Sequence, residues 1–161
     1  MSGDGLLRLH EETVRPEWLD YNGHLNLAYY LVAFDHASDK FLHHVGLGEA
    51  YTRAGGGSIF VVETHLVYRR EVLAGAPLAF TTQLLGHDGK RLHFIHHMHH
   101  AQEGFLAAAN EIMALHVGLE TRRAAPMPKP VLATLKALQA SHDRLPRPPE
   151  AGRSIGMKKP G

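Results

Sequence analysis

Apolar residues between Asn26 and Val45 recur at spacings of three and four, which is the periodicity of one face of an α-helix. This stripe consists of Leu27, Leu31, Phe34, the small residue Ser38, Phe41 and Val45. Polar side chains take the other side, namely Asp35, His36, Asp39, Lys40 and His43. Asn26 can cap the start of the helix, and Gly46 suits its C-terminal end. The pattern therefore predicts one long helix over 26–45.

After three consecutive glycines at 55–57, the period of the apolar positions changes from 3.6 to 2, which is typical of strands. The alternation predicts strands over 59–72, 78–84, 92–101 and 105–119, and an earlier strand over 6–14. Asp88-Gly89 and Gln102-Glu103-Gly104 are turn signals, and short turns force antiparallel pairing. The sequence thus predicts an α+β fold, in which one long helix packs on an antiparallel sheet of about five strands.

The chain length of 161 residues favours a single domain, which we place at 1–142. A short helix is expected over 131–141. From Asp143 onward, prolines, glycines and scattered basic residues predict a disordered C-terminal tail over 143–161.

The composition excludes several classes of function. Lys and Arg number 17 against 16 Asp and Glu, so no excess charge favours nucleic acid or an anionic membrane as partner. There is no cysteine, which rules out disulfides, thiolate metal sites and cysteine nucleophiles. No spanning apolar stretch and no leader pattern is seen, so a cytoplasmic location is expected.

The candidate chemistry lies between the first strand and the long helix, in the segment from Pro16 to Asn26. Asp20 supplies a carboxylate, and the helix start a few residues later offers unpaired N–H groups that suit an oxyanion. Together they provide the minimum for acyl transfer. The alternative is structural, with Asp20 and Asn22 forming an Asx-turn while Asn26 only caps the helix.

The run Asp20-Tyr21-Asn22-Gly23-His24-Leu25-Asn26, followed by Tyr30, resembles the signature of hot-dog-fold acyl-CoA thioesterases of the 4-hydroxybenzoyl-CoA thioesterase type. The resemblance covers about 7–119. More narrowly, 16–30 and 91–117 resemble the thioesterase domains attached to carnitine dehydrogenases, which act on betainyl-CoA. The resemblance implies that the sheet wraps around a central helix.

The resemblance also implies roles for individual residues. Asp20 would be the catalytic acid residue, acting as nucleophile or as general base toward water. His24 and Asn26 would orient Asp20 or water, or serve only the loop's shape. A backbone N–H near Leu27 would polarise the thioester carbonyl. Gly23 and Tyr30 occupy further motif positions and are expected near the substrate.

Three more residues are candidates for substrate binding, each with a plainer alternative. Glu63 can line the same cleft or lie on a solvated strand face. Arg69 and Arg91, at strand ends, can bind the phosphates of coenzyme A or be ordinary surface residues.

Aromatic rings can hold a quaternary ammonium group or simply pack in the core. The candidates are Trp18, Tyr21, Tyr51, Phe60 and Tyr68.

A histidine-rich strand carries His93, His97 and His99 on one face, with His96 and His100 on the other. Histidines at i and i+2 can ligate a metal, but no acidic partner at matching spacing completes a site. We expect sheet-surface or subunit-interface histidines, no metal, and no cofactor beyond the coenzyme A of the substrate.

The expected function is an acyl-CoA thioesterase that releases a free acid and CoA, with a short or betaine-like acyl group. One alternative is a hot-dog hydratase or dehydratase that uses His36 with Asp35 or Asp39; another is a non-catalytic acyl-CoA-binding module. Open sheet edges predict a homodimer or a dimer of dimers.

Overall fold

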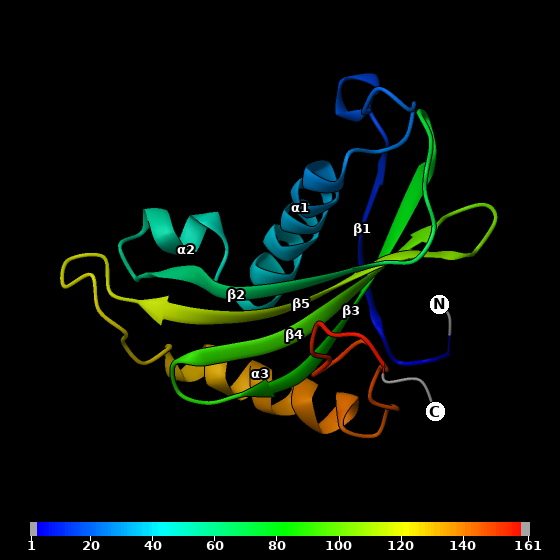
Figure 1. Cartoon of the computed structure of the whole chain (residues 1–161). Coiled ribbons are helices and arrows are strands. Elements are labelled where there is room, and N and C mark those ends of the chain that lie inside the picture. The colour runs from blue at the N-terminus through cyan, green and yellow to red at the C-terminus, as the bar shows by residue number, and fades with distance from the viewer. Residues whose placement is uncertain (1–2, 159–161) are drawn as a thin grey trace.

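The computed structural model describes residues 3–158, in which one long helix lies against a curved sheet (Figure 1). The elements in chain order are β1 (Leu7–Thr13), a 3-10 turn (Pro16–Trp18), α1 (Leu27–Val45), α2 (Glu49–Arg53), β2 (Ser58–Tyr68), β3 (Pro77–His87), β4 (Arg91–His100), β5 (Leu106–Val117) and α3 (Lys129–His142). The predicted strands and the long helix are present within a few residues of their expected bounds. The short helix α2 was not predicted.

The strands form one 5-stranded sheet in the order β1-β3-β4-β5-β2, with every neighbouring pair antiparallel. The β3–β4 and β4–β5 connections are the two short turns seen in the sequence. The strand β2 pairs with β5 and ends the sheet on one side, while β1 ends it on the other. The predicted α+β architecture is confirmed.

The long helix α1 buries one stripe of its surface on what we call the inner face of the sheet. Phe34 packs edge-on against Phe80 at 5.7 Å between ring centroids, and Phe41 meets Phe94 at 4.8 Å. Both α1 phenylalanines are fully buried, which is worth roughly 1.5–3 kcal/mol for each side chain. Gly46 ends the helix in the left-handed conformation, with φ of 90°.

His96 of β4 lies buried beneath α1 and is held from both sides. Its Nε2 is 2.9 Å from Ser38 Oγ on the helix, and its Nδ1 is 2.8 Å from Thr82 Oγ1 on β3. The polar Ser38 in the apolar stripe is explained by this contact. Burial foremost, with smaller effects from His97 and His10, lowers the pKa of His96 from 6.5 to about 3. His96 is therefore a neutral core residue.

The helix α3 covers the part of β3 that β1 leaves unpaired. Pairing of β1 with β3 ends at Leu7 and Thr82, so the next part of β3 has no strand beside it. There the Leu84 N–H donates to His142 Nδ1 at 2.8 Å, and Gln139 donates to the Leu84 carbonyl at 3.3 Å. Figure 1 shows α3 along this edge of the sheet.

The segment that follows α3 differs from the disordered tail expected over 143–161, as far as its described part to Lys158 is concerned. It lies against the outer face of the sheet. Glu150 is only 4% exposed, and it approaches His97 at 3.3 Å and Arg69 at 3.7 Å. The Gly152 N–H donates to the Glu111 carboxylate at 2.9 and 3.0 Å. Composition alone missed these contacts because their partners are far away in sequence. The domain boundary at 142 stays a prediction.

Between residues 3 and 158, none of the helices is both long and apolar enough to cross a membrane. The cytoplasmic location stays a prediction.

We expect His96 to make the protein less stable in acid. Between pH 6.5 and about 3 the unfolded chain carries a proton on this residue that the folded chain excludes. The free energy of unfolding should therefore fall by about 1.4 kcal/mol for each pH unit below the unfolded pKa. Urea unfolding of the wild type and of His96→Gln between about pH 7 and pH 5 measures this. Equal pH slopes for the two proteins would contradict the assignment.

Candidate active site

The loop between β1 and α1 is anchored to the body of the protein by backbone contacts and one buried ring. Trp18 is 4% exposed and stacks on Tyr29 of α1 at 6.0 Å, with the Arg15 guanidinium 4.9 Å from its ring centroid. The Asn26 N–H donates to the Trp18 carbonyl, and the Leu25 N–H donates to the Val72 carbonyl, both at 2.9 Å. The loop is thus held against both α1 and the turn that precedes β3.

Asp20 holds this loop in shape through one of its two carboxylate oxygens. Its Oδ1 accepts hydrogen bonds from the N–H groups of Asn22 at 2.8 Å and His24 at 3.2 Å. Gly23 sits between them at φ of 79°, where a side chain would be strained. Within residues 3–158, no group donates a hydrogen bond to the other oxygen, Oδ2. The Asx-turn alternative is therefore correct for Oδ1, and this turn does not use Oδ2.

The N-terminus of α1 presents one backbone donor. Asn26 caps the helix, because its Oδ1 accepts from the Ala28 N–H at 2.9 Å. The Tyr29 N–H is bonded to the Asn26 carbonyl at 2.9 Å. In the described part of the chain the Leu27 N–H has no acceptor, and the Leu27 side chain is 68% exposed. This N–H lies at the positive end of the helix dipole.

Two tyrosines support the start of α1. The hydroxyl of Tyr68 donates to the Leu27 carbonyl at 3.0 Å, and its ring meets Tyr30 edge-on at 5.0 Å. Burial foremost raises the pKa of Tyr30, a hydrogen bond with the Val72 backbone opposes the rise, and the negative charges of Glu71 and Asp20 add to it. Tyr30 is buried and stays protonated. It therefore supports the helix terminus from inside.

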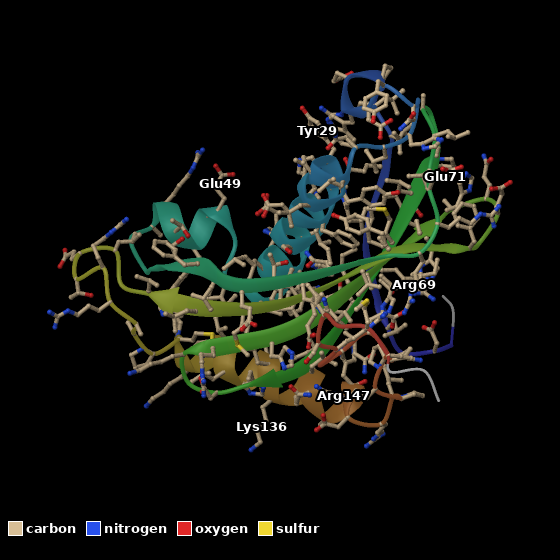
Figure 2. The ribbon with its side chains drawn as sticks, in the orientation of Figure 1. Tyr29, Glu49, Arg69, Glu71, Lys136 and Arg147 are labelled. Carbon is tan, nitrogen blue, oxygen red and sulfur yellow. The ribbon has the colours of Figure 1, made fainter. Side chains whose placement is uncertain are left out.

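His24 turns toward an acidic residue that sequence reasoning missed. Its Nδ1 lies 3.0 Å from Glu71 Oε2, and the backbone of His24 pairs with Leu73. Figure 2 shows Tyr29 and Glu71 at the end of the molecule where this loop lies, with Glu49 of α2 apart from them. Glu71 follows β2 in a turn, so no local pattern marks it as a partner of His24.

A hollow of about 300 Å³, here called the α1 groove, runs along α1 from its second residue. Its lining is formed by Ala28, Leu31, Val32, Asp35, Ser38, Val61, Thr64, Asn110 and Ile112. Asp35 is the one ionisable side chain in this lining. Asn110 is 1% exposed, and its Nδ2 has no hydrogen-bond partner among the described residues, while its Oδ1 accepts from Thr64. An apolar groove with one carboxylate thus adjoins the open helix end.

The structure does not bring every predicted residue to this place within one chain. Glu63 is on the outer face, where it lines a cavity of about 580 Å³ with His93 and Glu111. Arg69 follows β2 and approaches Glu150, also on the outer face. Arg91 binds Asp88 at 2.7 Å at the far end of β4, a strand length of about 30 Å from the loop. Substrate roles for these three residues stay predictions that would need a second subunit.

The aromatic rings are also dispersed. Tyr51 hydrogen-bonds to His116 beside the start of β2, whereas Tyr68 ends that strand, about 33 Å further on. The face of Trp18 is covered by Arg15, Phe60 lies under Arg122 at 5.5 Å, and Tyr21 is 98% exposed. One chain therefore does not assemble the aromatic cage that the sequence suggested.

Comparison with known proteins gives consistent results. The family model described as the thioesterase-like superfamily matches residues 14–135. A betainyl-CoA thioesterase from Pseudomonas aeruginosa is 45% identical over 152 residues, which cover 94% of this chain and 96% of the relative. An L-carnitine dehydrogenase/betainyl-CoA thioesterase from Rhizobium meliloti is 39% identical over 99% of this chain and 32% of its own length.

Solved structures match the fold. A candidate thioesterase from Pseudomonas putida KT2440 has a TM-score of 0.83 and 37% identity, covering 96% of this chain and 98% of that one. A hypothetical protein from Staphylococcus aureus, solved in complex with CoA, has a TM-score of 0.87 and 25% identity over 95% and 97% of the two chains. The predicted hot-dog fold and thioester hydrolase activity are confirmed. The chain belongs to the thioesterase-like superfamily.

Proposed function

We propose that this chain hydrolyses the thioester of a short, cationic acyl-CoA such as betainyl-CoA, with Asp20 and the N-terminus of α1 as its catalytic centre. The observation that carries this proposal is that, among residues 3–158, Asp20 Oδ2 and the Leu27 N–H are both without a hydrogen-bond partner, at the loop before α1 and at the helix start that the loop leads into. These two groups meet the two demands of acyl transfer, a base or nucleophile and a donor for the oxyanion.

In the proposed reaction, the thioester carbonyl oxygen accepts a hydrogen bond from the Leu27 N–H as negative charge develops on it. Asp20 either takes a proton from water as the water attacks, or attacks the carbonyl carbon itself to give an anhydride that water then cleaves. In both routes the C–S bond breaks, CoA leaves as a thiol, and the acyl group becomes a free acid. The two hydrogen bonds to Oδ1 keep Asp20 in place throughout.

The α1 groove suits the acyl group in this arrangement. It begins next to Leu27, its walls are mainly aliphatic, and it carries one carboxylate, Asp35. A trimethylammonium group is both apolar on its surface and positively charged, so it matches this combination. The betainyl-CoA thioesterase from Pseudomonas aeruginosa, 45% identical over nearly the whole chain, supports the same substrate class.

A hydratase is less well supported. Its acid and base would come from His36 with Asp35 or Asp39. The Nδ1 of His36 lies 3.0 Å from Glu12 on β1, whereas Asp35 lines the α1 groove. The His36 side chain thus contacts Glu12 and does not line the α1 groove.

We also propose a homodimer formed through the β2 edge. β2 ends the sheet and exposes Val61 and Val62 by 52% and 59%. Leu27 and Leu31 of the neighbouring α1 are exposed as well, so an apolar surface continues from strand to helix. A second copy on this edge would cover it and close the α1 groove.

Asp20→Asn is expected to lower kcat at least about 100-fold, because it removes the negative charge and keeps an oxygen that can accept the two loop N–H groups. The melting temperature should change little. Asp88→Asn is the control, since Asp88 Oδ1 also accepts from two backbone N–H groups, those of Lys90 and Arg91, but in a turn away from this loop. Near wild-type turnover by Asp20→Asn in a thiol-release assay would refute the proposed mechanism.

The role of Asp35 is tested with betainyl-CoA and its neutral isostere, 3,3-dimethylbutanoyl-CoA. Asp35 lies eight residues beyond Leu27, about 12 Å along the axis, and its side chain leans back toward the N-terminus. A charge separation of ~7 Å is worth about 0.6 kcal/mol in water and more in a closed groove. We therefore expect the wild type to favour betainyl-CoA in kcat/KM and Asp35→Asn to lose at least about threefold of that preference.

The control for Asp35 is Asp39→Asn, one helical turn further and outside the α1 groove lining. It should keep the wild-type preference. If Asp35→Asn keeps the wild-type preference for betainyl-CoA over the neutral isostere, the proposed role of Asp35 is wrong. The proposal that the chain hydrolyses acyl-CoA is not affected by that result.

Val62→Lys is expected to weaken dimerisation by placing a charge in the middle of the β2 edge. Sedimentation equilibrium should give a mass of two chains for the wild type and a shift toward 17.8 kDa for the variant. Leu73→Lys, at a residue that is 54% exposed in the segment between β2 and β3, is the control. A wild type that sediments as a monomer at micromolar concentration would contradict this assembly.

A further inference from the structure

Three side chains with metal-ligand chemistry meet on the side of α1 that faces β1. His10 and Glu12 lie two residues apart on β1, so both point to the inner face, where they pair with Phe80 and Leu78 of β3. His36 comes from α1. One ligand atom from each of the three lies within 4.8 Å of the others. Neither the hydrogen-bond network of Asp20 nor the α1 groove includes them.

The three groups converge on one carboxylate. Glu12 Oε1 lies 3.1 Å from His10 Nε2 and 3.1 Å from His36 Nδ1, and Glu12 Oε2 lies 3.0 Å from the same His36 nitrogen. In a tetrahedral zinc site with bonds of about 2.0–2.2 Å, neighbouring ligand atoms are about 3.3 Å apart. The two separations from Glu12 are close to that value, and the two histidine nitrogens lie within 4.8 Å of each other, so side-chain rotations can place an ion among the three atoms.

The surroundings hold the ligands in place. The side chains of His10 and Glu12 are each 12% exposed, and that of His36 is 36% exposed. The His10 ring packs on Phe80 at 5.2 Å and lies edge-on to His36 at 6.1 Å, and Trp18 is 6.2 Å from His36. Fixed rings lose little conformational freedom when they bind an ion. They should therefore bind a metal more tightly than a cluster of flexible surface side chains would.

The cluster borders a solvent-filled cavity between β1, α1 and α2. His10 and His36 line a cavity of about 810 Å³ that also contains Asp39, Lys40 and Glu49. This cavity offers an entry path, and its water can fill the fourth coordination position. Two histidines, one carboxylate and one water is a donor set that zinc accepts in proteins.

We propose that His10, Glu12 and His36 bind one zinc ion, which joins β1 to α1. These two elements bracket the loop that carries Asp20, since β1 ends at Thr13 and α1 begins at Leu27. The ion would therefore fix both ends of that loop. The site stands apart from the proposed hydrolysis, because its ligands belong to neither Asp20, the Leu27 N–H nor the α1 groove.

Zinc binding to the full chain, first stripped with a chelator, is the test. Equilibrium dialysis against Zn²⁺ should give one tightly bound ion per chain, and Glu12→Gln should bind at least about tenfold more weakly while still accepting a hydrogen bond from a histidine. Glu111→Gln is the control, because Glu111 lies 2.7 Å from His93 in a pair that gains no third ligand among residues 3–158. Zinc should raise the melting temperature of the wild type and of the control, and not that of Glu12→Gln.

Co²⁺ gives a second readout, since the wild type should develop the intense visible bands of a tetrahedral site and Glu12→Gln should not. Circular dichroism checks the folding of each variant. If Glu12→Gln does not fold, His36→Gln replaces it, because His36 is the most exposed of the three. The chain has 14 histidines, so zinc bound equally by wild type and variants would be adventitious and would overturn the proposal, as would no binding to the wild type.

Discussion

The burial of α1 against the inner face of the sheet is the contact on which the rest of the structure depends. Phe34 and Phe41 anchor the helix to β3 and β4, and Ser38 adds a hydrogen bond to the buried His96. A helix held along its whole length has a fixed N-terminus. The unpaired Leu27 N–H therefore keeps one direction, which its proposed role as oxyanion donor requires before substrate binds.

The loop before α1 depends on the same packing, because Trp18 stacks on Tyr29 and Asn26 both caps the helix and hydrogen-bonds to Trp18. In the proposed mechanism, Asp20 combines two functions that are often treated as alternatives. One carboxylate oxygen holds the loop, and the other is the one proposed to react. The α1 groove begins at Ala28, beside this proposed centre, and is the proposed place of the acyl group.

Local patterns in the sequence predict most of the fold. The spacing of apolar residues from Phe34 to Val45 in α1 and the alternation in β3 to β5 reflect burial on one face, which leaves a direct trace in the chain, whereas Leu27 and Leu31 of the predicted stripe are exposed. The motif from Asp20 to Asn26 identified the loop for a similar reason, because its residues are neighbours both in sequence and in space. No local pattern in the sequence indicates the order of the strands in the sheet.

The contacts that sequence could not predict join distant segments. Glu71 meets His24, Glu150 returns to the outer face of the sheet, and Glu12 meets His36 across 24 residues. Glu63 and Arg91 were predicted to contact the substrate because their side chains suit it chemically. The structure places Glu63 on the outer face of the sheet and Arg91 at the end of β4 far from the loop. Asn110 left one signal, a single amide in the apolar run of β5, that only the structure explains.

The most direct test of the proposed catalytic centre is a crystal structure of the protein with a betainyl-CoA analogue in which a methylene group replaces the thioester sulfur. We predict that the analogue's carbonyl oxygen lies about 2.7–3.1 Å from the Leu27 nitrogen, with Asp20 Oδ2 facing the carbonyl carbon and the trimethylammonium group in the α1 groove. An acyl group bound in the outer-face cavity beside Glu63, or a carbonyl that points away from the start of α1, would contradict this account.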